Sequence, residues 1–158
     1  MTPYKDLAHI HSLNGEIKEV TVIAIDTESE STAVVADWFY ELYQKYGLRI
    51  YKVGYDVKFA NEFLHRMDDY GFETKMILQR AEVLSQPISM TEVDLKDKLI
   101  IGLNEMDRWC LGNCSLNVNN QGFGMLEKIK GQNGRRIDGA LTLVMAIETW
   151  KRYNSYLN

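Results

Sequence analysis

The chain has 158 residues, 46% of them hydrophobic and 25% charged, which is the composition of an ordinary globular domain. Its net charge of -4 argues against a protein that coats nucleic acid by bulk attraction, although a local basic patch is compatible with it. No apolar run is long enough to cross a bilayer, and the N-terminus lacks the charged-then-apolar order of a signal peptide. We therefore expect one domain over residues 1–158, with no membrane contact, in a cytoplasm.

The first expected element is a β-hairpin. Asn14-Gly15 is a strong signal for a two-residue hairpin turn, and it lies between two segments of strand character. We place these strands at about 7–13 and 16–25. An acidic loop, DTESEST, follows the second strand.

Helices and strands alternate after the acidic loop. Ser31 or Thr32 is expected to cap the helix AVVADWFYELYQKY, which Gly47 ends. A strand in LRIYKVGY that stops at Asp56, a helix in KFANEFLHRMDDYG and a strand in FETKMILQ are expected next. Apolar residues recur at helical spacing in both helices: Val35, Trp38, Phe39 and Leu42 in the first, and Phe59, Phe63 and Met67 in the second. This order predicts a mixed α/β sheet with crossover helices.

The second half of the chain is expected to hold two longer helices and an irregular segment between them. The first of these helices is expected to begin near Ser85, at a turn that Pro87 favours. The stretch 99–134 is typical of a strand, a short helical turn and an irregular or hairpin segment. The last helix is expected over about 139–154. No repeat or linker interrupts the chain, so we expect one compact unit.

Two cysteines and two histidines permit a metal site in principle. Cys110 and Cys114 form a CxxxC pair, and His9 and His11 lie on one face of an expected strand. No feature of the sequence brings the two pairs together. The simpler interpretation is reduced thiols in a half-buried hairpin and histidines on an exposed strand.

Two aspartates occupy positions where α/β folds gather ligands. Asp56 lies just after the C-terminal end of an expected strand, and Asp138 lies at the start of the last helix. If both face one edge of the sheet, they form a pair of oxygen ligands suited to Mg²⁺ or Mn²⁺. The alternative is structural, because an aspartate after a strand is often a turn former and one before a helix is often an N-cap.

A basic segment precedes Asp138. It contains Lys128, Lys130, Arg135 and Arg136, with glycine, glutamine and asparagine between them and no acidic residue. Such a segment can contact phosphates without reading bases. Together with metal ions that activate water and stabilise a leaving oxygen, it is typical of a nuclease.

Four motifs in order resemble one protein family. YGLRIYKVGYD, a glutamine followed by LSQP, DRWCLGN, and KIKGQNGRRIDGALTLVMAI are similar to the C-terminal nuclease half of the large terminase subunit of tailed phages. The resemblance spans about residues 20–150. It implies an RNase H-like mixed β-sheet flanked by helices, a divalent-metal site of acidic residues, and cleavage of double-stranded DNA during genome packaging. It also implies a phage or prophage protein in the cytoplasm of a bacterial host, with the terminase small subunit and the portal as partners.

Carried over residue by residue, the resemblance makes Asp56 and Asp138 metal ligands and catalytic residues. It places Lys130 where the family tends to have a lysine before its last aspartate. Asn113 and Lys130 become candidate contacts to DNA, whereas Trp109 is expected to pack.

The chain departs from the family in two ways. It has no GxxxxGK[ST] phosphate loop, so we expect no ATPase domain in it. The family's first metal-binding aspartate lies on a strand before the hairpin, whereas here only MTPYKDL comes first and Asp6 is its sole acid. We therefore expect a fragment, or a split or truncated gene product, that lacks this first strand and part of the metal site.

The stretch VIAIDTESES offers a different pair of ligands. It resembles the strand-then-DxE opening of proofreading-type exonucleases, in which Asp26 and Glu28 would bind metal. That fold needs a further strand pair before its first helix, whereas here a helix follows at once. A solvated acidic loop is the better account, with Asp26 kept as a replacement metal ligand.

The sequence leaves three functions open. The first is a metal-dependent endonuclease domain that cuts double-stranded DNA, with Asp56 and Asp138 at a two-metal site. The second is a catalytically incomplete terminase fragment that serves as an assembly or DNA-docking module. The third is an RNase H-like nuclease of another family, in which Asp26 and Glu28 converge with Asp138.

Overall fold

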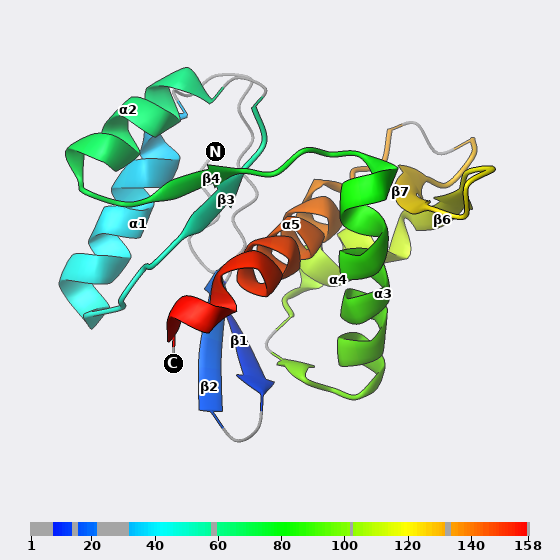
Figure 1. Cartoon of the computed structure of the whole chain (residues 1–158), viewed down its shortest axis with the longest axis horizontal. Helices are drawn as coiled ribbons and strands as arrows, with labels where there is room; N and C mark the ends of the chain where they lie inside the picture. The colour runs from blue at the N-terminus through cyan, green and yellow to red at the C-terminus, as the bar shows by residue number, and fades with distance from the viewer. Residues whose placement is uncertain are drawn as a thin grey trace.

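A computed structural model describes the backbone of six stretches of the chain: residues 8–13, 16–21, 32–57, 60–101, 103–131 and 134–157 (Figure 1). It describes side chains from residue 32 to residue 155 within these stretches, except at residue 101. None of the helices in the described part combines the length and the apolar character needed to span a membrane.

The N-terminal elements form the expected hairpin. β1 (Ala8–Leu13) pairs antiparallel with β2 (Glu16–Thr21), so that Leu13 lies opposite Glu16. β5 (Ile100–Ile101) adds to the other edge of β1, also antiparallel. The hairpin prediction is confirmed, and residues 22–25 of its expected second strand lie outside the described residues.

The first helix matches its sequence signals at one end only. α1 (Ala33–Tyr46) ends at Gly47, whose φ of 64° is left-handed and favours glycine. Thr32 occupies the N-cap position in a helical conformation, and its side chain makes no capping hydrogen bond. Thr32 therefore lies at one of the two predicted N-cap positions but lacks the capping hydrogen bond, and Ser31, the other, lies outside the described residues.

A parallel pair of short strands follows α1. β3 (Val53–Tyr55) and β4 (Thr74–Met76) pair in parallel, and α2 (Asn61–Asp69) forms the crossover between them. Both strands are shorter than expected. Parallel pairing makes their carboxyl ends meet at one edge, and this edge carries the residues that follow β3 and β4.

The side chains of β3 alternate between two layers of helices, as a strand with two covered faces requires. Val53 and Tyr55 pack with α1 and α2. Gly54 faces the opposite way, toward Thr149 of α5 (Asp138–Tyr153). Figure 1 shows the resulting order, with α1 and α2 on one side of β3–β4 and α5 on the other.

The long helix α3 (Ala81–Lys96) packs along α5 (Figure 1). It begins four residues before the expected start at Ser85, so Pro87 lies inside the helix and does not open it. Pro87 has no N–H to donate to the carbonyl of Val83, which weakens the helix at this point. Burial compensates for this loss, because Pro87 itself is buried and the contact with α5 holds a core cluster: Ile77, Leu84, Ile88, Val144 and Met145.

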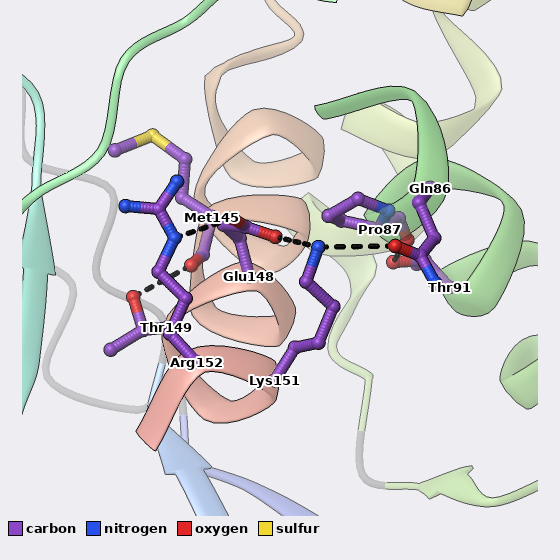
Figure 2. A network of polar contacts seen from close by, with 8 residues as sticks. All are labelled: Gln86, Pro87, Thr91, Met145, Glu148, Thr149, Lys151 and Arg152. Carbon is purple, nitrogen blue, oxygen red and sulfur yellow. Dashed lines mark hydrogen bonds and ion pairs between the residues drawn. The ribbon is translucent and has the colours of Figure 1, made fainter. Parts of the chain in front are cut away.

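Polar contacts flank this apolar contact between α3 and α5 (Figure 2). Glu148 of α5 is only 3% exposed, and its carboxylate lies 2.5 Å from Nε of Arg152 and 2.6 Å from Nζ of Lys151. Lys151 also donates to Oε1 of Gln86 on α3, at 3.3 Å. The buried carboxylate of Glu148 thus pairs with two cations of its own helix, and one of them, Lys151, also bonds a side chain of α3.

The remaining elements lie between α3 and α5 in sequence. α4 (Glu105–Gly112) begins with a capping box, in which Asn104 and the buried Asp107 exchange two hydrogen bonds. β6 (Cys114–Val118) and β7 (Gly124–Lys128) form an antiparallel hairpin, and the 3-10 helix η1 (Asn154–Leu157) follows α5. In the described part of the chain the strands form three small sheets, β2–β1–β5, β3–β4 and β6–β7.

Candidate functional site

Asp56 lies at the carboxyl edge of the parallel strand pair. It directly follows β3 and is half-buried, and its Oδ2 atom accepts a hydrogen bond of 3.1 Å from Nε2 of Gln79. Gln79 itself follows β4. The two side chains meet because parallel strands end at the same edge, which is the position expected for Asp56.

Gln79 also connects this edge to the last helix. Its Nε2 atom lies 3.7 Å from Sδ of Met145 on α5. Met145 and Asp138 are separated by two helical turns, so they lie on the same side of α5, about 10 Å apart along its axis. Asp56 therefore lies at a strand edge that contacts α5, the helix that begins with Asp138. The pairing of the two aspartates stays a prediction.

Asp138 is not the N-cap of α5. Ile137 occupies that position, and Asp138 is the first helical residue, where its backbone carbonyl accepts a hydrogen bond from Thr142. Its side chain is exposed and has no hydrogen bond or ion pair to any residue that the structure describes. The N-cap interpretation of Asp138 is wrong. It requires a helix that begins at Gly139, whereas α5 begins at Asp138 itself. A carboxylate in the first turn is still favourable to the helix dipole.

The start of α5 is braced by α4. A Cβ atom at Gly139 would lie 3.2 Å from Sγ of Cys110, so the Cys110 side chain packs directly against Gly139. Burial raises the pKa of the Cys110 thiol, and the backbone N–H of Gly139 partly opposes this shift. Cys110 is therefore a neutral packing thiol at the base of the segment that carries Asp138.

The cysteines do not form part of a metal cluster in the described residues. Cys110 lies on α4 and not in a hairpin, whereas Cys114 begins the β6–β7 hairpin and is half-buried, as expected. Burial raises the pKa of the Cys114 thiol to about 11, which disfavours the thiolate that metals bind. The side chains of His9 and His11 lie outside the described residues.

Asn113 is buried and uses its carboxamide within the protein. Its Nδ2 atom donates to the carbonyl of Arg136 at 3.0 Å, and its Oδ1 atom accepts from Nη1 of Arg135 at 3.2 Å. The side chain is only 2% exposed. A direct contact of Asn113 with DNA, which the resemblance implies, stays a prediction that this burial does not favour.

The basic segment before α5 lies on the surface. Its four expected phosphate contacts are all exposed: Lys128, Lys130, Arg135 and Arg136. Trp109 was expected to pack, but its side chain is 42% exposed. The four cations and Asp138 are thus all exposed, whereas Asn113 holds Arg135 and Arg136 and Cys110 packs against Gly139 beneath them.

Among the described residues, no three His, Cys, Asp or Glu side chains come together to hold a metal ion. Asp26 and Glu28 lie outside the described residues. Sequence reasoning quoted Gln79 as the glutamine before LSQP but gave it no role, although the rule that singled out Asp56 also applies to it, because both residues follow parallel strands.

Comparisons with known proteins give one structural match. No protein-family description and no curated protein matches the sequence. The structure is similar to the crystal structure of the large terminase nuclease from thermophilic phage G20c, with a TM-score of 0.58 and 14% sequence identity. The similarity covers 87% of this chain and 67% of the other.

The chain has an RNase H-like α/β fold. This confirms the expected fold class. At 14% identity the similarity establishes the fold alone, so the activity of the phage protein is not transferred by it.

Proposed function

We propose that the chain is a divalent-metal-dependent endonuclease domain that cuts double-stranded DNA during phage genome packaging. The observation that carries the proposal is the position of Asp56 at the carboxyl edge of β3–β4, an edge that Gln79 connects to α5, the helix that begins with Asp138. This placement occurs in a fold shared with a phage terminase nuclease.

The two aspartates are suited to Mg²⁺ or Mn²⁺. Both provide hard oxygen donors, and the Asp138 carboxylate has no hydrogen bond or ion pair within the described residues to compete with a metal. Bound ions would activate water and neutralise charge at the scissile phosphate. Asp56 and Asp138 hold the ions, Gln79 orients Asp56, and Asp26 is proposed as the further ligand.

The basic segment would bind the DNA backbone. Lys128, Lys130, Arg135 and Arg136 are exposed and precede Asp138 in the sequence, and cations of this kind contact phosphates without reading bases. Four phosphate contacts would lower the logarithm of the binding constant by roughly 3 to 4 for each tenfold rise in salt. Binding is therefore expected to be weak at physiological salt and to show little sequence preference.

The proposal extends to partners and place of action. A packaging nuclease would act with the terminase small subunit and the portal, in the cytoplasm of a bacterial host. Motor activity is not part of the proposal, because the sequence has no phosphate loop.

A second candidate function is a catalytically incomplete terminase module that docks on DNA or on the packaging assembly. The observation that favours it is the absence of a third ligating side chain near the two aspartates within the described residues. This module would bind DNA equally well with and without magnesium. A third candidate, a proofreading-type nuclease, requires Asp26 and Glu28 as ligands.

Cleavage of supercoiled plasmid in the presence of manganese tests the proposal. The unchanged chain is expected to nick or linearise the plasmid, and Asp56→Ala and Asp138→Ala are each expected to abolish this. Asp69→Ala is the matched control, because Asp69 is an exposed carboxylate on α2, away from the site. Equal cleavage by Asp138→Ala and the unchanged chain would overturn the proposal. Metal-independent DNA binding without cleavage would favour the docking module.

A further inference from the structure

Asn113 holds both ends of the basic segment between β7 and α5. At the first end, its backbone carbonyl accepts a hydrogen bond of 3.1 Å from the N–H of Ile129. At the second end, its side chain donates to the carbonyl of Arg136 at 3.0 Å. A single residue thus closes the loop that carries Lys130 and Arg135.

The same side chain also holds one of the cations. The Oδ1 atom of Asn113 accepts from Nη1 of Arg135 at 3.2 Å, so the buried carboxamide donates to Arg136 and accepts from Arg135. Arg135 remains exposed, and its guanidinium has further N–H groups that can bind a phosphate. Fixing a long arginine side chain before binding reduces the entropy lost when it meets its ligand.

Asn113 is itself anchored to a rigid element. Its backbone N–H donates to the carbonyl of Cys110 on α4, and Cys110 packs against Gly139 at the start of α5. The capping box of Asn104 and Asp107 fixes the opposite end of α4. Hence the loop is tied to the same helix that sets the position of Asp138.

We infer that Asn113 is a clasp that presets the basic segment for the DNA backbone and fixes Arg135 in the segment that leads to Asp138. The inference rests on the proposed function for its ligand and goes beyond it by assigning a positioning residue. Asn113 acts through Arg135 and Arg136 and does not touch the DNA.

Limited proteolysis tests the clasp without DNA. Trypsin cuts after Arg135 and Arg136, and Asn113→Ala is expected to speed these cuts roughly tenfold, because two hydrogen bonds that hold the segment are lost. Thr91→Ala is the matched control, since it removes a buried hydroxyl that donates to the Pro87 carbonyl, on α3. If Asn113→Ala does not fold, Arg135→Ala opens one contact from the exposed side and should speed the cut after Arg136. Unchanged cutting in the folded variants would overturn the inference.

A double-mutant cycle on DNA affinity tests the positioning role. With a short duplex in EDTA, Asn113→Ala and Arg135→Ala are each expected to weaken binding several-fold and to lower the salt slope by about one. The loss in the double variant is expected to be smaller than the sum of the two single losses, because part of the effect of Asn113 passes through Arg135. Additive losses would mean a merely structural Asn113 and would overturn the inference. Faster tryptic cutting in a chain that never binds DNA would support the clasp while overturning the nuclease function.

Discussion

Gly54 of β3 and Thr149 of α5 lie so close together that a Cβ atom at position 54 would overlap Oγ1 of Thr149. Thr149 is buried, and its hydroxyl donates to the carbonyl of Met145. The Thr149 side chain therefore cannot move aside easily to make room for a larger residue at position 54. This contact fixes the distance between the strand that leads to Asp56 and the helix that begins with Asp138.

Gly54→Ala is expected to destabilise the fold by about 2 kcal/mol or more, because a methyl group there forces α5 away from β3. For a chain of this size the melting temperature should fall by roughly 4–8 °C. Gly112→Ala is the control, since no atom lies within 4 Å of a Cβ atom at that position. Adding Thr149→Ala should restore part of the loss in a thermal melt. A Gly54→Ala chain as stable as the unchanged one would contradict this close packing.

The fold was largely readable from the sequence because its signals are local. Asn14-Gly15 marks the hairpin, Gly47 marks the end of α1, and the alternation of helices and strands predicts the parallel pair. The start of α3 was misplaced because Pro87 is a helix breaker in isolation, whereas its burial against α5 outweighs that preference here. A local rule cannot include a contact with a helix that lies much later in the chain.

Gln79→Ala is expected to reduce cleavage by about tenfold and to raise the manganese concentration needed for half-maximal rate, because Asp56 loses the group that orients it. A manganese titration of plasmid cleavage measures both effects. Gln86→Ala is the control, as Gln86 is an exposed glutamine on α3 that bonds Lys151 instead. An unchanged titration in Gln79→Ala would show that the orientation of Asp56 does not depend on Gln79.

Glu148→Ala is expected to lower the free energy of unfolding by about 1–3 kcal/mol, because it removes the buried partner of Lys151 and Arg152. Urea unfolding measures this loss. The comparison is Glu92→Ala, which breaks an exposed pair with Lys96 at the same helical spacing and should change the free energy of unfolding by under about 0.5 kcal/mol. An equal fall in the free energy of unfolding in the two variants would show that the burial of Glu148 adds nothing to the strength of its ion pairs.

The Cys114 thiol is expected to make the folded chain less stable as the pH rises into the alkaline range. Burial raises its pKa from an ordinary value of 9.0 to about 11, so the folded chain keeps a proton that the unfolded chain loses. Its contribution is fully present below pH 9 and is lost as the pH rises from 9 toward 11. Cys114→Ser should therefore lose less stability than the unchanged chain between pH 8 and pH 10 in paired urea titrations. If the free energy of unfolding of the two proteins changes equally with pH, Cys114 is not the source of the pH dependence.

The candidate site was only half readable from the sequence. Asp56 and the cations could be named, because a residue after a strand and an uninterrupted basic segment are visible in one dimension. The contacts of Asn113 with Arg135 and of Gln79 with Met145 join residues far apart in the chain, so only the folded structure reveals them. Spacing could not decide between N-cap and first helical residue for Asp138, since the two differ by a single position.

The central position of α5 has a consequence for how the chain folds during synthesis. β3, α3 and α4 all contact this helix, which is made after every one of them. Until residues 138–153 leave the ribosome, Ile77, Leu84 and Ile88 lack the partners that bury them. Folding must therefore wait for the last helix, as is usual when distant segments complete a core. The step that shields this apolar surface also brings α5, which begins with Asp138, against β3, which leads to Asp56, so the core and the framework of the candidate site form together.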